Sequence, residues 1–280
     1  MKKLFLFLTA LIVINTNSIA QQHNKGKLYF YWGWNSDRFS KSDIKFSGND
    51  YGFTLKSVSA ADRQSKVSIT YIDPGNMTIP QYNFRLGYFI DDHWNISFGI
   101  DHMKYVMKQD QSVAINGEIH TGREFDGIYN NAPIKLTPQF LMFEHTDGLN
   151  YVNIELRKNE HIYHVPFSSK KARGMDINVL AGLGGGILYP RTNATLMGQE
   201  RNDVFHLSGY GISAVAGINF TFFNHFFIQG ELKGGYINMP DIRTTKDNTD
   251  KASQHFLFYQ KNVVFGATIP LFKPKNDHKS

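Results

Sequence analysis

The sequence predicts an all-β fold: an up-and-down antiparallel transmembrane β-barrel of about eight strands with long extracellular loops. The first observation is an alternation of apolar residues with small or polar ones over 209–222, with Val215 as the exception. It marks a strand because successive side chains point to opposite faces. The second is that the same alternation recurs along most of the chain. The third is a composition rich in Phe, Tyr and Gly, which suits a wall with an apolar outside and a narrow interior.

Two segments define the repeating unit. Residues 209–236 predict a hairpin with the three-residue loop 223–225. Because the loop length is odd, the apolar side chains of both strands lie on the same face of the hairpin. Phe222 is then opposite Phe226, and Gly217 is opposite Glu231. Residues 81–106 repeat the arrangement and place Arg85 opposite Gly99. A large charged side chain opposite a glycine is what a narrow barrel interior requires.

The remaining strands are placed by the same alternation. The eight predicted strands are 27–35, 80–90, 94–106, 149–157, 174–189, 207–222, 226–238 and 255–271. We expect the connections after the first, third, fifth and seventh strands to be extracellular. Within them, Asn116-Gly117 predicts a type I′ hairpin. Residues 44–55 predict a second small hairpin, and the barrel would have ten strands if that hairpin joined the wall. Residues 158–173 read as a polar connection of about sixteen residues.

The ends of the chain predict processing and export. Lys2-Lys3, an apolar run over 4–14 and the small residues of Ser18-Ile19-Ala20 form a signal peptide over 1–20, with a run too short to span a bilayer. The barrel domain is then 21–272, and 273–280 is a polar tail. The chain has no Cys, which excludes a disulfide scaffold. Its net charge of +6 is diffuse, so we expect no nucleic-acid partner.

The signal peptide, the alternating aromatic strands and the segment Val264–Phe272 together resemble the small Gram-negative outer-membrane β-barrel proteins. The resemblance implies a location in the cell outer membrane. It also implies lipids and lipopolysaccharide as partners, the barrel-assembly machinery as a partner during biogenesis, and a monomeric state. Two features depart from the family pattern: eight residues follow Phe272, and Pro270 lies inside the terminal segment. Members of the family include structural barrels, adhesion proteins and lipid-modifying enzymes, so the resemblance leaves the activity open.

Charged residues of both signs fall on the predicted inner faces of the strands. They are Arg85, Asp101, Glu155, Arg157, Asp176, Glu231 and Lys233. Three positive and four negative charges nearly cancel, and an eight-stranded barrel is just wide enough for side chains to fill it. We interpret the set as a salt-bridged plug, because buried charge is tolerated only when it is paired. The alternative is a narrow polar conduit.

Aromatic residues lie near the ends of the predicted strands, on the outward faces. They are Trp32, Trp34, Tyr82, Tyr88, Trp94, Phe222, Phe226 and Tyr236. Amphipathic rings at such positions are typical of the aromatic girdles at the two membrane interfaces.

Few residues suggest chemistry. His102, His145 and Asp147 are candidates for catalysis near the outer rim. Asp101 cannot orient His102, since neighbours on a strand face opposite sides. His161 and His164 are not expected to converge on one face of a strand, so we expect no metal and no cofactor.

These observations favour an integral outer-membrane barrel with a filled polar lumen and a structural or surface-interaction role rather than catalysis. Three alternatives remain. The first is an outer-membrane lipid-modifying hydrolase or acyltransferase that uses rim residues. The second is a narrow channel for small solutes. The third is a soluble ligand-binding barrel of the periplasm.

Overall fold

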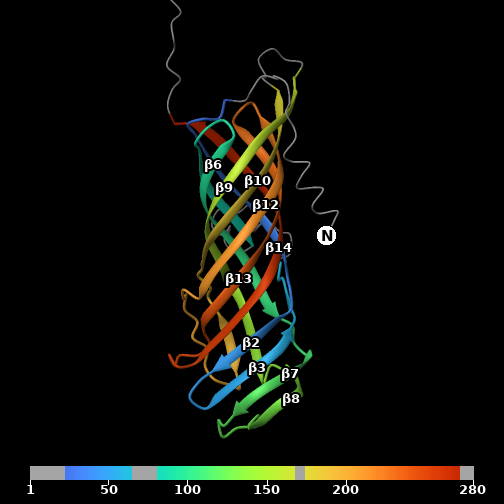
Figure 1. Ribbon diagram of the computed structural model, residues 1–280, viewed down its shortest axis with the longest axis vertical. Helices are drawn as coiled ribbons and strands as arrows, with labels where there is room; N and C mark the ends of the chain where they lie inside the picture. Colours follow the sequence, from blue (N-terminus) through green and yellow to red (C-terminus); the bar gives the residue numbers. More distant parts are fainter. Residues whose placement is uncertain (1–22, 65–80, 168–173, 272–280) are drawn as a thin grey trace, which may run out of the picture.

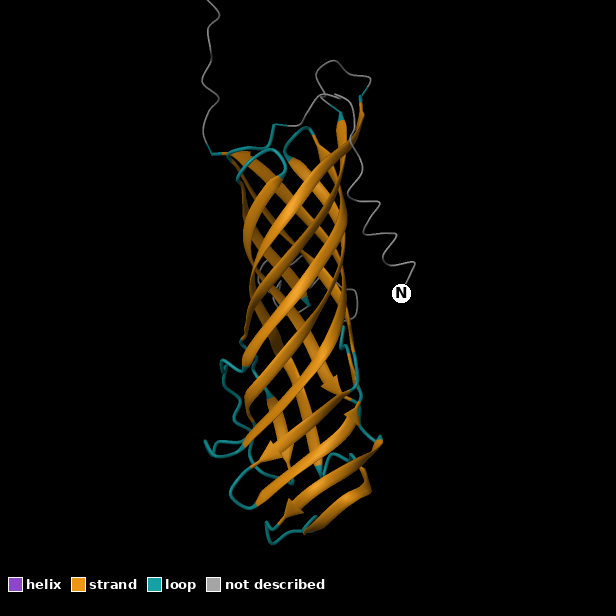
Figure 2. Ribbon diagram, viewed as in Figure 1, coloured by secondary structure: helices purple, strands orange, loops and turns teal. Residues whose placement is uncertain are grey.

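The computed structural model describes residues 23–64, 81–167 and 174–271. They form a long, narrow barrel of tilted strands (Figures 1 and 2). The predicted signal peptide over 1–20 and the polar tail over 273–280 lie outside the described residues, as does Phe272. No helix in the described parts of the chain is long and apolar enough to cross a membrane.

Eight antiparallel strands close into a ring, which confirms the predicted number. Their bounds are β1 (Lys27–Phe39), β5 (Tyr82–Phe89), β6 (Trp94–Met107), β9 (Leu141–Val165), β10 (Met175–Leu188), β12 (Gly209–Phe222), β13 (Phe226–Arg243) and β14 (Lys251–Pro270). The ring closes where β1 pairs with β14, from Lys27 opposite Pro270 to Phe39 opposite Phe258. Closure removes the two free edges that an open sheet of this size would expose.

Four further strands continue the sheet beyond one end of the ring: β2 (Ser42–Ser47), β3 (Tyr51–Val58), β7 (Ser112–Ile119) and β8 (Gly127–Lys135). We call them the strand extension, and the end that carries them the extension end. Figure 1 shows them below the ring. The opposite end, where β5–β6 and β12–β13 are joined by short turns, is the turn end. Two short strands, β4 (Ala60–Ala61) and β11 (Asn193–Leu196), pair with β6 and β9.

The predicted register is confirmed at each pair named from the sequence. Phe222 lies opposite Phe226, Gly217 opposite Glu231 and Arg85 opposite Gly99. The hairpin over 44–55 also forms, but it pairs with the end of β14 beyond the ring, so the wall keeps eight strands and not ten.

Two predictions about connections are wrong. Asn116-Gly117 does not turn the chain but lies inside β7, where the register shifts between Ile115 and Gly117. Gly117 takes a φ of +125° and packs closely on β3, so pairing with β3 overrides the local turn preference. Of the polar connection predicted over 158–173, residues 158–165 are not a loop, because β9 continues to Val165, and residues 168–173 lie outside the described residues.

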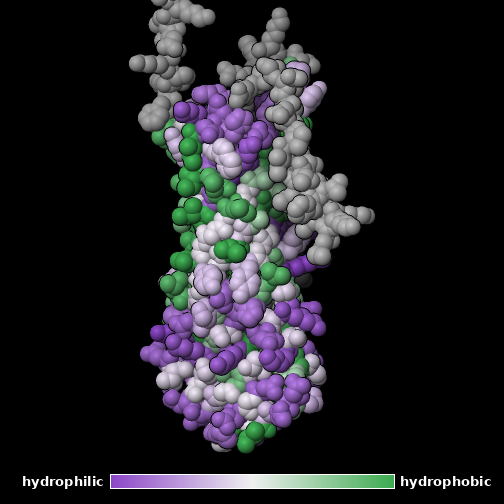
Figure 3. All heavy atoms as spheres, in the orientation of Figure 1, coloured by the Kyte–Doolittle hydropathy of each residue, from purple (hydrophilic) through white to green (hydrophobic). Residues whose placement is uncertain are grey.

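The barrel has an inverted distribution of polarity. Apolar side chains on the outside of the ring are exposed, among them Leu183 at 70%, Phe226 at 63% and Leu257 at 60%. Charged side chains inside the ring are sealed from solvent, with Arg85 at 0%. Figure 3 shows apolar and weakly polar residues around the middle of the barrel and hydrophilic residues at both ends.

The interior changes character along the barrel axis. At the extension end it is an apolar core to which the strand extension contributes Phe46 and Phe53 and the ring contributes Tyr105 and Phe256. Rings stack here, with 5.2 Å between the centroids of Phe46 and Phe53 and 5.1 Å between those of Tyr105 and Phe256. The core closes the lumen at this end by the hydrophobic burial that stabilises soluble domains.

Gly99 gives a direct test of the filled interior. A Cβ at this position would lie 2.7 Å from the Arg85 Cζ, so Gly99→Val must push the guanidinium out of its ion pairs. We expect a loss of about 3 kcal/mol or more in the free energy of unfolding, measured with denaturant on protein refolded in detergent. The matched control is Gly230→Val, since nothing lies within 4 Å of a Cβ at this outward-facing glycine. Equal stability of the two variants would contradict a packed lumen.

Candidate functional site

A cluster of ion pairs fills the ring next to the apolar core, and Glu155 is at its centre. Arg85 Nη2 and Lys233 Nζ lie 2.8 and 2.6 Å from Glu155 Oε1. Arg157 Nε lies 2.6 Å from Glu155 Oε2. Three cations from β5, β9 and β13 therefore share one carboxylate, and all four side chains are almost fully buried.

Two further carboxylates balance the charge of this cluster. Arg157 Nη1 lies 2.7 Å from Glu231 Oε1, and Lys233 also pairs with Asp101. The Tyr31 hydroxyl accepts hydrogen bonds from Arg85 Nε and from Arg157 Nη2, at 3.0 and 2.9 Å. Three cations thus meet three anions, and the fork-shaped guanidinium groups hold several partners at once. We call these six charged residues the ionic plug.

The structure brings together six of the seven predicted lumen residues and leaves Asp176 apart. Asp176 lies at the turn end, where its Oδ1 is 3.1 Å from His161 Nε2 and 2.7 Å from His164 Nδ1. The prediction that these two histidines do not converge is wrong. His161 shares the inward face of β9 with Arg157 and Asn159 by alternation. The register of β9 against β10 then shifts at Ile162, and this bulge turns His164 to the same face, toward Asp176.

Sequence alternation could not locate this bulge, because no local motif marks Ile162. The resulting trio combines two imidazoles with one carboxylate. Within the described residues, however, no group of three or more His, Asp or Glu side chains has an arrangement suited to a metal ion.

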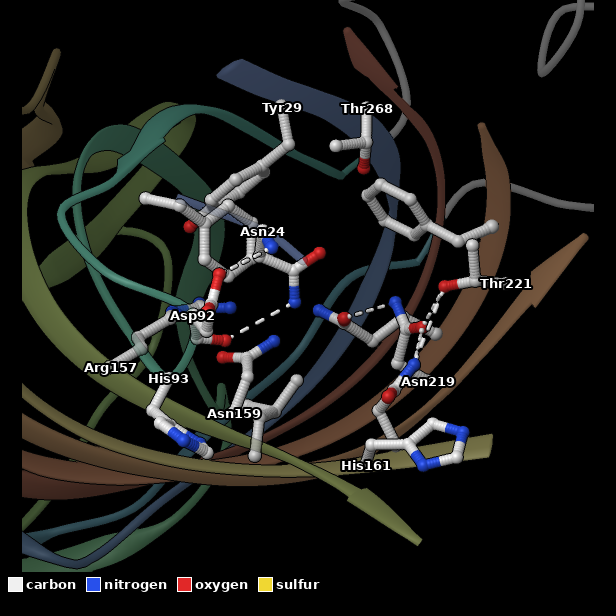
Figure 4. A pocket seen from close by; sticks show the side chains of 15 residues that line it. Asn24, Tyr29, Asp92, His93, Arg157, Asn159, His161, Asn219, Thr221 and Thr268 are labelled. Carbon is white, nitrogen blue, oxygen red and sulfur yellow. Dashed lines mark hydrogen bonds between the residues drawn. The ribbon is translucent and has the colours of Figure 1, made fainter. Parts of the chain in front are cut away.

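A small polar vestibule opens at the turn end and stops at the ionic plug (Figure 4). Its volume is about 50 Å³, and Arg157 lies among its lining residues. Amides line one side, where Asn178 Nδ2 donates to Asn219 Oδ1 at 3.2 Å and Asn219 Nδ2 donates to Gln229 Oε1 at 2.9 Å. The rings of Tyr29 and Phe227 lie 6.5 Å apart on the other side. The vestibule has room for a few water molecules but does not continue through the barrel.

The predicted catalytic histidines lie on opposite sides of the wall. His102 faces outward, stacked on Tyr82 at 4.9 Å between ring centroids, and its Nδ1 lies 2.8 Å from Asn150 Oδ1. Asp101 faces inward to Lys233, as the alternation requires. The side chain of Asp147 is outside the described atoms.

His145 is fully buried in the interior of the extension end. Its Nδ1 lies 2.9 Å from Thr192 Oγ1, and its Nε2 lies 3.3 Å from Gln254 Nε2. The rings of Tyr105 and Phe143 pack around it. A neutral ring that carries its proton on Nδ1 satisfies both polar neighbours, and burial lowers the pKa of His145 to about 3. In the described part of the chain the His145 side chain is therefore not exposed to solvent.

The predicted girdle residues all lie on outward-facing positions. Next to the short turns are Tyr88, Trp94, Phe222 and Phe226, and nearer the extension end are Trp34, Tyr82 and Tyr236, with Trp32 between. Trp32 and Trp34 meet edge to face at 5.1 Å. Whether they mark two membrane interfaces stays a prediction.

A scan of the sequence against protein-family models found no match, and a search of curated proteins found none either. Solved structures similar to this chain include the outer membrane protein OprG from Pseudomonas aeruginosa, with 11% identity, 89% of this chain and 98% of that chain covered, and a TM-score of 0.40. Neisserial surface protein A matches at 11% identity over 88% and 100% of the two chains, with a TM-score of 0.31. The Escherichia coli outer membrane protease OmpT matches at 7% identity over 91% and 99%, with a TM-score of 0.26. At these TM-scores we base no statement about activity on the likeness.

The ionic plug predicts a strong dependence on Lys233. Lys233→Met removes the cation between Asp101 and Glu155 and leaves buried negative charge without its partner. We expect a loss of about 3–5 kcal/mol in the free energy of unfolding. The double variant Lys233→Met/Asp101→Asn removes one of the stranded charges and should recover part of the loss, as a double-mutant cycle would measure. Additive effects of the two substitutions would contradict the coupling.

The buried His145 predicts a loss of stability in acid. Because its folded-state pKa lies below the ordinary value of about 6.5, the unfolded chain binds the extra proton. The contribution of this ring is therefore complete above pH 6.5 and is lost as the pH falls toward 3. Between pH 6.5 and 5 it amounts to at most about 2 kcal/mol. We expect His145→Gln to lose this part of the acid sensitivity, measured as the free energy of unfolding at the two pH values; identical pH profiles would contradict it.

Proposed function

We propose that the chain is an integral protein of a bacterial outer membrane, with a filled lumen and a structural or surface-interaction role. The observation that carries this proposal is the inverted polarity of the ring. Large apolar side chains such as Phe226 and Leu257 are exposed around the outside, while the ionic plug is sealed within. A contiguous apolar belt is unfavourable in water and is what a lipid environment requires.

The height of the apolar belt suits a bilayer. Along β13 the outward residues run from Phe226 to Tyr236, ten residues apart. A rise of about 3.3 Å per residue at a tilt of about 40° corresponds to roughly 25 Å along the barrel axis. This agrees with the apolar band of outer-membrane barrels, which is about 25 Å tall.

The two ends of the barrel support an orientation. Short turns of outer-membrane barrels face the periplasm and longer connections face outward. We therefore place the turn end in the periplasm and the strand extension outside the cell. The extension is an ordered sheet over an apolar core. Among the described strands its last one, β8, pairs only with β7, and it exposes Ile128 at 82%. An ordered, partly apolar surface of this kind supports a role in contacts outside the cell.

The interior supports a closed barrel over a conduit. A solute that enters the vestibule meets the ionic plug and then the apolar core, and moving either aside would separate buried charges or packed rings. The arrangement gives no support to a lipid-modifying enzyme, because His102 and His145 do not share a site. Lipids, lipopolysaccharide and the barrel-assembly machinery remain the partners we expect.

Single cysteines test the location and the orientation together, because the chain has none of its own. Asn130 on β8 and Lys25 at the turn end are both exposed. We expect both Asn130→Cys and Lys25→Cys proteins in the outer-membrane fraction. On intact cells a membrane-impermeant maleimide should label only Asn130→Cys, and permeabilised cells should label both.

Three outcomes would contradict the proposal. Recovery of the protein in the soluble periplasmic fraction would rule out an integral membrane barrel. Labelling of Lys25→Cys but not Asn130→Cys on intact cells would show that the barrel has the opposite orientation, with the turn end outside the cell. Discrete conductance steps in a planar bilayer containing the purified protein would favour the narrow channel over the filled lumen.

A further inference from the structure

Near the extension end, β14 changes its pairing partner from β1 to β2. β1 pairs with β14 as far as Phe39 opposite Phe258, and β2 takes over at Ile44 opposite Gln254. Between the two, only Ser40 holds the chain to β14: its N–H donates to the Leu257 carbonyl at 2.8 Å, and its Oγ accepts from the Leu257 N–H at 3.0 Å. The crossing from β1 to β2 leaves a recess of about 260 Å³.

The recess lies at the border between the apolar belt and the polar extension. Leu257 and Tyr236 line it on the side of the belt, and Leu257 is 60% exposed. Lys41, His255 and Ser57 line it on the side of the extension, and all three are exposed. In the orientation proposed above, this border lies at the depth of the lipid headgroups in the outer leaflet.

The charge in and around the recess is positive. Among the described residues that line it, Asp43 carries the one carboxylate. This carboxylate lies 2.8 Å from Lys56 Nζ and accepts a hydrogen bond of 2.8 Å from the Ser57 N–H. Lys41 has no ion pair with a carboxylate in the described parts of the chain. Two further exposed cations, Arg38 and Lys45, follow on the neighbouring outward positions of β1 and β2.

His255 adds a second donor beside Lys41. It faces outward from β14, and its ring centroid lies 6.0 Å from that of Tyr236. An ammonium group, an imidazole and the hydroxyls of Ser40 and Ser57 thus surround one space. Several N–H and O–H donors around a net positive charge match the three acceptor oxygens of a phosphate group.

We propose that this recess binds the phosphate group of a phosphorylated lipid of the outer leaflet. Lys41 and His255 contact the phosphate oxygens, and the acyl chains lie against Leu257 and the apolar belt below it. The inference rests on the proposed outer-membrane location, because it needs the recess to lie at headgroup depth. It goes beyond that location in assigning a lipid-binding site to named residues. Basic pockets at such depths bind acidic headgroups in other membrane proteins.

The test is lipid binding by the full-length protein refolded in detergent micelles, with bisphosphorylated lipid A as the probe and native mass spectrometry as the readout. We expect the double variant Lys41→Ser/His255→Ser to bind about tenfold more weakly. The matched control is Lys108→Ser, an exposed lysine outside the recess that loses the same charge, and its affinity should match that of the wild type.

A third variant distinguishes a lost site from a damaged fold. Asp43→Asn removes the negative charge beside the phosphate and keeps a side-chain oxygen to accept from the Ser57 N–H. We expect it to bind lipid A more tightly than the wild type, which a misfolded barrel would not do. Unchanged or weaker binding by Asp43→Asn would count against the recess as the phosphate site.

The remaining outcomes separate this inference from the proposed location. Equal binding of bisphosphorylated and dephosphorylated lipid A, or equal binding by the double variant and the wild type, would overturn the lipid site while the protein remained in the membrane fraction. Displacement of lipid A by inorganic phosphate alone would make the recess a phosphate site and overturn the lipid proposal. Failure of the wild type to enter the membrane fraction would instead overturn the location on which the inference rests.

Discussion

The narrow interior of an eight-stranded ring is the constraint on which the rest of this structure depends. Such a ring has room for side chains but not for a water-filled passage, so every inward residue must find a partner within the wall. Glu155, for example, forms ion pairs with three cations from three different strands. The glycines opposite the largest charged side chains are part of the same solution, because a Cβ at Gly99 or Gly184 would collide with Arg85 or Glu155.

The interior is filled by different kinds of side chain at different positions along the barrel axis. Within the apolar belt, where the backbone hydrogen bonds already form the wall, the lumen is filled by paired charges and amides. Beyond the belt, the strand extension adds side chains of its own and the filling becomes an apolar core. This order has a physical reason. In a membrane the outside of the wall must be apolar, so charge can be placed only inside, whereas beyond the membrane the ordinary hydrophobic core is available again.

The strand extension also makes one place in the barrel wall irregular. Because β14 is longer than β1, its end is free to pair with β2, and the sheet continues through β3, β7 and β8. The connection after β1 supplies β2 and β3 to this sheet, and the connection after β6 supplies β7 and β8. The crossing from β1 to β2 leaves the recess beside Ser40. One difference in strand length thus accounts for both the closed mouth and the basic recess.

The sequence by itself determined the features that depend on a period of two. The number of ring strands, the pairing of Gly217 with Glu231 and of Arg85 with Gly99, and the inward placement of the charges all follow from alternation and from odd loop lengths. Only the tertiary structure decided what depends on contacts between distant strands. The bulge at Ile162 brought His164 to the inward face that His161 already shares, and both meet Asp176 there. Pairing with β3 kept Asn116-Gly117 in a strand although the dipeptide favours a turn. The alternation also could not predict which carboxylate pairs with which cation, because the pairing depends on the tilt and closure of the whole ring and not on a local motif.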